Sequence, residues 1–130
     1  MLREVIATDG APAAVGPYSQ AIRVGNLVFT AGQIGLDPAT GALAAGLEEQ
    51  TRQVMSNLQA VLAAAGSNLQ NIIKTTIFLT DLADFQTVNA IYGSYFPQQP
   101  PARSTVQVAG LPRGARIEIE AIALVDAHAT

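Results

Sequence analysis

The sequence predicts an α+β protein in which one β-sheet carries two helices on one of its faces. Three observations support this class. Residues 47–65 and 85–95 place apolar side chains at steps of three and four, which is typical of amphipathic helices. Residues 101–109 and 116–121 alternate with a period of two, as strands do. The elements follow the order strand, strand, helix, strand, helix, strand, strand, and 130 residues suit one domain, 1–130.

Residues 1–20 are predicted to be irregular, because prolines such as Pro17 cannot donate a hydrogen bond to a neighbouring strand. Two apolar runs, 21–24 and 27–31, flank a Gly-Asn pair, which is typical of a tight hairpin turn. Glycines and an Asp-Pro-Ala-Thr-Gly stretch then indicate loops and turns over 32–41.

The first helix is predicted over 47–65, with one apolar stripe along its length. Glu48 and Glu49 suit the positive N-terminal end of this helix, and Gly66 is placed to end it.

Residues 72–80 are rich in strand-forming side chains and are predicted as a strand that is buried on both faces. Asp84 is predicted to cap the second helix, 85–95. Prolines at 97, 100 and 101 end that helix and lead into the strand 101–109.

The last two strands are joined by a short link, so the residues alone predict that they pair as a hairpin. The strands are apolar on both sides, and helices on one face leave the other face uncovered. The chain is 49% hydrophobic and only 13% charged. We therefore predict that the uncovered face packs against other copies of the chain, in a homo-oligomer.

Composition argues against several functional classes. A net charge of −3 and a pI near 4.9 argue against nucleic acid as a partner. The chain has no Cys, so it has no disulfide, no thiol nucleophile and no thiolate metal site. The one histidine, His128, has no cluster of ligands around it in sequence, and we expect neither a metal nor another cofactor. No signal peptide or membrane span is evident, which favours the cytoplasm.

Two charged residues on the last two strands are the first candidates for function. Arg103 offers a planar fork of donors that grips a carboxylate at two points. The alternative is a structural ion pair with Glu118, Glu120 or a neighbouring subunit. Glu118 is a candidate for moving protons, and its alternative is a solvated or Arg-paired strand residue.

Two further residues are weaker candidates. Tyr18 lies in a proline-flanked loop, where its ring can wall a pocket or simply pack against the loop. Asn89 follows an apolar position of the second helix, and this position alone favours an ordinary polar residue at the surface or at the helix end.

Five motifs span nearly the whole chain: Gly16-Pro17-Tyr18-Ser19-Gln20, Thr30-Ala31-Gly32-Gln33-Ile34, Asp84-Phe85-Gln86-Thr87-Val88-Asn89, Pro101-Ala102-Arg103-Ser104 and Ile117-Glu118-Ile119-Glu120-Ala121. In this order they resemble the RidA (YjgF-like) family. The resemblance implies a chorismate-mutase-like α+β fold, assembled as a homotrimer with clefts between subunits. It also implies that the final strand inserts between other strands of the sheet, which differs from the hairpin expected above.

The resemblance implies hydrolysis of reactive 2-enamines and 2-imines, such as 2-aminoacrylate and 2-iminopropanoate, to a 2-keto acid and ammonia. Pyridoxal-phosphate enzymes release these compounds, and the family removes them. Carried over, Arg103 binds the substrate carboxylate and Glu118 handles water or the departing nitrogen. No cofactor or metal is implied.

The same resemblance assigns the rest of the pocket. Tyr18, Ala31, Gly32 and Asn89 line the cleft, and the backbone amide of Thr105 holds water or the carboxylate. Many relatives carry Cys where this chain has Thr105 and Ser where it has Ala31, so substrate preference stays open. Two other functions also stay open: a trimeric sensor that binds a small carboxylate or keto acid without turnover, and an endoribonuclease.

Overall fold

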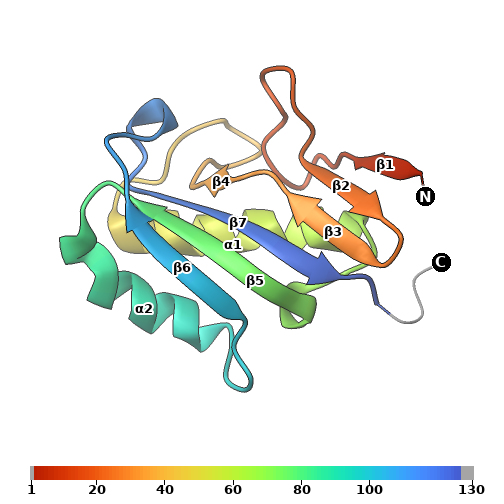
Figure 1. The fold of residues 1–130 in the computed structure, drawn as a ribbon. Coiled ribbons are helices and arrows are strands. Elements are labelled where there is room, and N and C mark those ends of the chain that lie inside the picture. The colour runs from red at the N-terminus through yellow and green to blue at the C-terminus, as the bar shows by residue number, and fades with distance from the viewer. Residues whose placement is uncertain (1, 127–130) are drawn as a thin grey trace.

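The computed structural model describes residues 2–126, which form one mixed sheet and two helices (Figure 1). The strands are β1 (Arg3–Ile6), β2 (Ala21–Val24), β3 (Leu27–Thr30), β4 (Gln33–Ile34), β5 (Ile72–Leu79), β6 (Ala102–Gln107) and β7 (Ile117–Leu124). The helices are α1 (Leu47–Ala64) and α2 (Phe85–Ser94). The predicted helices and the five predicted strands are confirmed, with bounds that agree to within three residues.

The strand order is β1-β2-β3-β7-β5-β6, and β4 also pairs with β7. β7 is antiparallel to both β3 and β5, whereas β6 is parallel to β5. The hairpin of the last two strands is therefore wrong, and the inserted final strand implied by the family resemblance is confirmed. The physical reason is burial. β7 has an apolar side chain buried at every second position and takes a central place, while the more polar β6 forms an edge.

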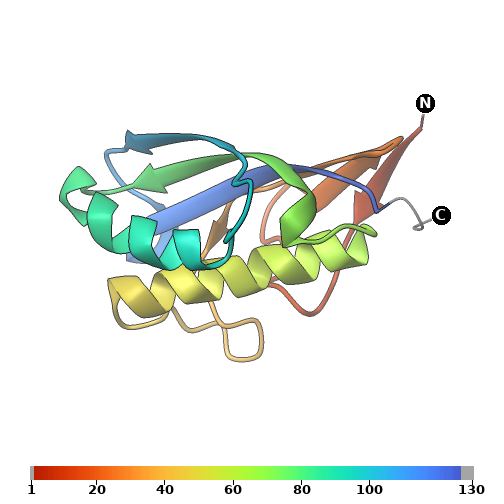
Figure 2. The ribbon, with the colours of Figure 1, turned by 90° about the horizontal axis from the view of Figure 1, so that it is seen from below.

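Both helices cover the same face of the sheet, as Figure 2 shows, and the opposite face is open. The apolar stripe of α1 is fully buried at Val54, Leu58 and Val61. Gly66 has a φ of 82° and follows the last turn of α1, so it ends the helix as predicted. The core thus lies between the helices and the alternate, inward-facing residues of β5 and β7.

Three local predictions fail. Residues 3–6 form an exposed edge strand, β1, although the N-terminal region was expected to be irregular. The two-residue strand β4 lies in a segment expected to be loop. The Asp84 side chain does not cap α2, because both of its carboxylate oxygens accept hydrogen bonds from Arg116 Nη2 at 3.0 Å.

Strand β5 was predicted to be buried on both faces, but within one chain it is buried only on the face that meets the helices. Thr75, Ile77 and Leu79 are buried, whereas Lys74 is exposed and Phe78 is half-buried on the open face. Among residues 2–126, no helix combines the length and the apolar character that crossing a membrane requires.

Candidate active site

The predicted site residues fall into two groups on opposite faces of the sheet. Arg103 is opposite Thr75 in the β5–β6 register, and Thr75 is buried on the helix face. Glu118 is opposite Phe78 in the β5–β7 register, and neighbouring residues of a strand point to opposite faces. Arg103 and Glu118 therefore do not meet within one chain, and the ion pair weighed for them above does not form there.

Arg103 lies against two aromatic rings of α2. Its Cζ atom is 5.4 Å from the ring centroid of Phe85 and 5.2 Å from that of Tyr92. The Tyr92 hydroxyl is hydrogen-bonded to Thr75 Oγ1 at 2.7 Å. Burial raises the pKa of Tyr92 above its ordinary value, so the ring beneath the guanidinium stays neutral at physiological pH.

No carboxylate of residues 2–126 forms an ion pair with Arg103. The two rings contact the guanidinium without taking up its N–H donors. This arrangement suits two-point binding of a carboxylate.

Two polar atoms near Arg103 are buried and lack a hydrogen-bond partner: Asn89 Oδ1 and Thr105 Oγ1. They are the only such side-chain atoms in the described part of the chain. Asn89, Tyr92 and Arg103 line a cavity of about 440 Å³ between α2 and the start of β6. An unpartnered buried polar atom costs ~1–3 kcal/mol, so a ligand that supplies its hydrogen bond is favoured here. We call Asn89, Arg103 and Thr105 the arginine half-site.

The second group gathers around Glu118. Tyr18, Ala31, Gly32 and Glu118 line one cavity of about 420 Å³. The other lining residues are mostly apolar: Pro12, Ala13, Val15, Gln33, Ile34, Leu36, Pro112 and Arg113. We call Tyr18, Ala31, Gly32 and Glu118 the glutamate half-site.

Burial raises the pKa of the Glu118 carboxyl above its ordinary value, and the negative charge of Glu120 raises it further. Glu118 is paired with Ile34 across β4 and β7, so the backbone of both strands sets its position. A carboxyl group with a raised pKa in an apolar cavity is suited to giving and taking protons near neutral pH.

Buried amides of α1 hold the segments around Glu118, and no sequence motif pointed to these amides. Asn57 donates to the carbonyl oxygens of Ile34 and Leu36 at 3.2 and 2.9 Å. The Gln50 side chain accepts a hydrogen bond from the backbone N–H of Arg116 at 2.9 Å. Both lie on the buried face of α1, and an amide among apolar stripe positions is the signal that identifies such residues.

Gln20 holds the loop that carries Tyr18. Its side-chain Nε2 donates to the carbonyl oxygens of Thr8, Ala11 and Pro12, and its Oε1 accepts from the Thr8 N–H. Gln20 is 4% exposed, so four hydrogen bonds are made by one buried amide. This loop is the wall of the glutamate half-site.

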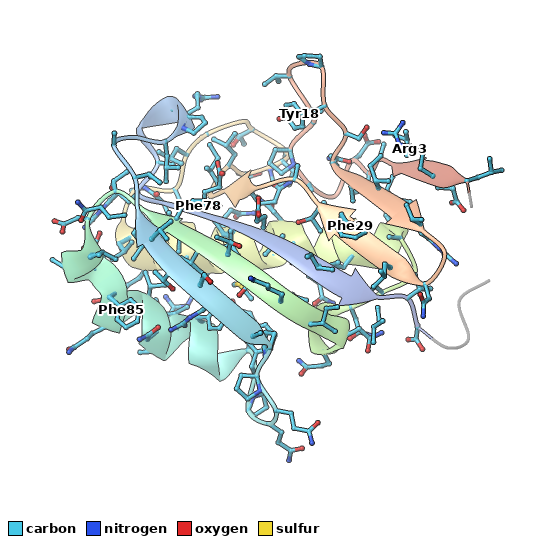
Figure 3. All side chains as sticks on the ribbon, viewed as in Figure 1. Arg3, Tyr18, Phe29, Phe78 and Phe85 are labelled. Carbon is cyan, nitrogen blue, oxygen red and sulfur yellow. The ribbon has the colours of Figure 1, made fainter. Side chains whose placement is uncertain are left out.

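Figure 3 labels Tyr18 of the glutamate half-site and Phe85, whose ring contacts Arg103. Tyr18 lies in the loop before β2, and Phe85 lies on α2 beyond the opposite edge of the sheet. Residues 2–126 contain no group of three His, Asp or Glu side chains placed to hold a metal ion. His128 lies outside the described residues.

The structure is thus that of a small α+β protein that carries one candidate half-site on each face of its sheet. A family model described as endoribonuclease L-PSP matches residues 8–125. The chain belongs to this family, which is the RidA (YjgF-like) family of the resemblance noted above.

Individual relatives agree. The chain is 56% identical over 122 residues to the chloroplastic reactive intermediate deaminase A of Arabidopsis thaliana, covering 93% of this chain and 65% of that protein. It is 51% identical to the 2-iminobutanoate/2-iminopropanoate deaminase of Mus musculus, covering 95% and 93% of the two chains. The crystal structure of E. coli TdcF, which contains bound serine, has a TM-score of 0.91 at 44% identity and covers 95% and 99%. The predicted fold class is confirmed.

Proposed function

We propose that this protein hydrolyses 2-imines and 2-enamines of small amino acids to 2-keto acids and ammonia. The observation that carries the proposal is Arg103, whose guanidinium lies against two rings of α2, beside polar atoms that lack partners. Relatives named as imine and reactive-intermediate deaminases, at 51% and 56% identity, support this chemistry. The amino acid bound to E. coli TdcF supports a small carboxylate as the ligand.

Each complete site needs two copies of the chain, because one chain holds the half-sites on opposite faces of its sheet. We propose a homotrimer in which the arginine half-site of one subunit faces the glutamate half-site of the next. The open face supports this assembly. Phe29, Val106 and Leu124 are 43%, 42% and 41% exposed on it, and such apolar surface favours association. The cleft between subunits is then the active site.

In this cleft Arg103 binds the substrate carboxylate through two parallel N–H donors. The Thr105 backbone amide and the Asn89 side chain complete the polar contacts. The protonated imine carbon is already electrophilic, so a fixed carboxylate and a positioned water suffice for reaction.

Glu118 moves the protons. Water adds to the imine carbon, the C=N electron pair moves to nitrogen, and the Glu118 carboxylate takes the proton that the water loses. Glu118 then returns this proton to the nitrogen, and the C–N bond breaks. The hydroxyl proton passes to the departing ammonia, and the products are a keto acid and ammonium. An enamine first gains a proton at carbon to become the same imine.

The direct test is ammonia and keto-acid release from 2-iminopropanoate, generated in place by an amino-acid oxidase. Arg103→Ala is expected to lose about two to three decades in kcat/KM, because a two-point charged contact is worth ~2–4 kcal/mol in the transition state. Arg52→Ala is the matched control, since Arg52 makes only an exposed pair with Glu48 at 3.8 Å. Equal activity of Arg103→Ala and wild type would contradict the proposal.

The same assay separates the two other functions. A wild-type protein that binds pyruvate through Arg103 without accelerating hydrolysis is a small-carboxylate sensor. Cleavage of RNA that survives Arg103→Ala indicates an endoribonuclease. An acidic chain with pI near 4.9 is expected to bind RNA weakly, so nucleic acid is not proposed as a partner.

A further inference from the structure

Gly32 and the Glu118 carboxyl occupy adjoining space in the glutamate half-site. Gly32 lies in the connection between β3 and β4, and β4 pairs with β7 at Glu118. A Cβ atom added to Gly32 would lie 2.5 Å from Glu118 Oε2, 2.7 Å from Cδ and 2.9 Å from Cγ. These separations are shorter than any van der Waals contact between carbon and oxygen or carbon and carbon. The carboxyl group therefore uses the space that a side chain at position 32 would fill.

The requirement for glycine here is spatial. Gly32 does not have a positive φ, so its backbone conformation is open to any residue. The three nearest atoms that a Cβ would meet all belong to the flexible side chain of Glu118, and none of the three is a backbone atom. A methyl group at position 32 is therefore expected to displace the Glu118 carboxyl rather than to unfold the protein.

We propose that Gly32 is a positioning residue, whose missing side chain lets the Glu118 carboxyl rest against the backbone between β3 and β4. From that place Glu118 exchanges protons with water and the departing nitrogen. This inference rests on the proposed function for its catalytic consequence, but the placement of the carboxyl is testable without turnover.

The charged and titratable groups around Glu118 come from several elements. Glu120 follows it on β7, and Lys74 lies on β5 on the same open face. Arg113 and Tyr18 line the cavity from the two loops that close it. A displaced Glu118 carboxyl leaves its buried place for water, so its pKa falls toward the ordinary value, and the other four groups stay where they are.

The chain offers a matched control for the substitution. A Cβ at Gly46 would also lie 2.5 Å from a carboxylate oxygen, Glu49 Oε2, at the start of α1. Neither Gly46 nor Glu49 lines either cavity of the half-sites. Gly46→Ala therefore repeats the local chemistry of Gly32→Ala outside the site.

The kinetic experiment is a double-mutant cycle of Gly32→Ala and Glu118→Gln, with 2-iminopropanoate as substrate. Misplacing a catalytic group by about 1 Å can cost about 10²-fold, so Gly32→Ala is expected to lower kcat by about 10- to 100-fold with little change in KM. In the Glu118→Gln background the same change is expected to lower kcat by less than about twofold, because the displaced group is already gone. Gly46→Ala is expected to match wild type.

Two kinetic results would overturn the inference. One is an equal loss from Gly32→Ala with and without Glu118, which means that Gly32 does not act through that carboxyl. The other is a rise in KM with kcat unchanged, which means that the methyl group obstructs substrate. Thermal unfolding of each variant shows whether a loss reflects damage to the fold.

A second readout needs no activity. Carboxyl ¹³C shifts of the glutamates are followed by NMR against pH, and Glu118 is assigned by its absence in Glu118→Gln. The Glu118 titration is expected at a lower pH in Gly32→Ala than in wild type, and unchanged in Gly46→Ala. An unchanged Glu118 titration in Gly32→Ala overturns the inference. If wild type fails to hydrolyse the imine while the titration moves as expected, the proposed function fails and the positioning role of Gly32 stands.

Discussion

The arginine and glutamate half-sites are built by different means. Arg103 is held by the rings of Phe85 and Tyr92, so side chains of one helix set its position. Glu118 is held by strand pairing, by the space that Gly32 leaves because it has no side chain, and by an apolar cavity wall. The first arrangement keeps a permanent charge ready for an anion. The second raises the pKa of a carboxyl group above its ordinary value.

This difference indicates a division of labour across one sheet. Binding is expected to depend on α2 and β6, and proton transfer on β4 and β7. Changes in the arginine half-site should therefore appear mainly in substrate affinity, and changes in the glutamate half-site mainly in kcat and in its pH dependence.

Among substitutions that test this difference between the half-sites, Glu118→Gln is expected to have the largest effect on kcat. General acid–base catalysis contributes about 10²- to 10⁴-fold, and kcat for imine hydrolysis should fall within this range. KM should change little, because the carboxylate is bound on the other half-site. A large rise in KM with kcat preserved would contradict the division of labour.

The same variant should be more stable than wild type at neutral pH. Since burial raises the pKa of Glu118 in the folded state, the folded protein binds this proton more tightly than the unfolded chain does. The contribution of protonated Glu118 to stability is fully present below the ordinary glutamate pKa of 4.5, and it is lost as the pH rises through the pKa of Glu118 in the folded protein. Gln resembles the protonated acid at every pH. The midpoint temperature of thermal unfolding should thus be higher for Glu118→Gln than for wild type at pH 7, and the two midpoints should converge at acidic pH. Equal midpoints at every pH would contradict this.

A smaller effect is expected in the arginine half-site from Phe85→Leu, which keeps an apolar side chain and removes one ring face. A cation–π contact at a partly exposed site is worth ~0.5–1 kcal/mol, so KM should rise by about two- to fivefold with kcat nearly unchanged. Steady-state kinetics with 2-iminopropanoate measure both quantities. A selective loss of kcat would show that Phe85 does not serve binding alone.

Much of the fold follows from sequence pattern. The periodicities of α1, α2, β5 and β7 are long enough to place these elements closely. β1 and β4 were missed because strands of four and two residues carry no measurable period, and neither is joined to its neighbour by a recognisable hairpin turn, as β2 and β3 are. The central position of β7 could not be predicted from the residues alone, because the short link between β6 and β7 favours pairing of these two strands. Only the family resemblance indicated that β7 is inserted between other strands.

The candidate residues could be named from the sequence, several of them only through the family resemblance, but their division between two faces could not. Alternation shows that Arg103 and Thr105 share a face of their strand, and that Glu118 and Glu120 share a face of theirs. It does not show which of these faces turns toward the helices. That depends on register, here the pairing of Thr75 with Arg103 and of Phe78 with Glu118.

The central claim is that each active site combines Arg103 of one chain with Glu118 of another. Subunit complementation tests it most directly. Arg103→Ala and Glu118→Gln are co-expressed with different tags, purified as mixed oligomers and assayed for imine hydrolysis. Random mixing in a ring of three makes about one quarter of the clefts intact, so activity should recover to about one quarter of wild type. Mixed oligomers of Arg103→Ala with the double variant Arg103→Ala/Glu118→Gln are the control and should stay inactive. No recovery in the first mixture would place both residues in the same chain's site and contradict the account.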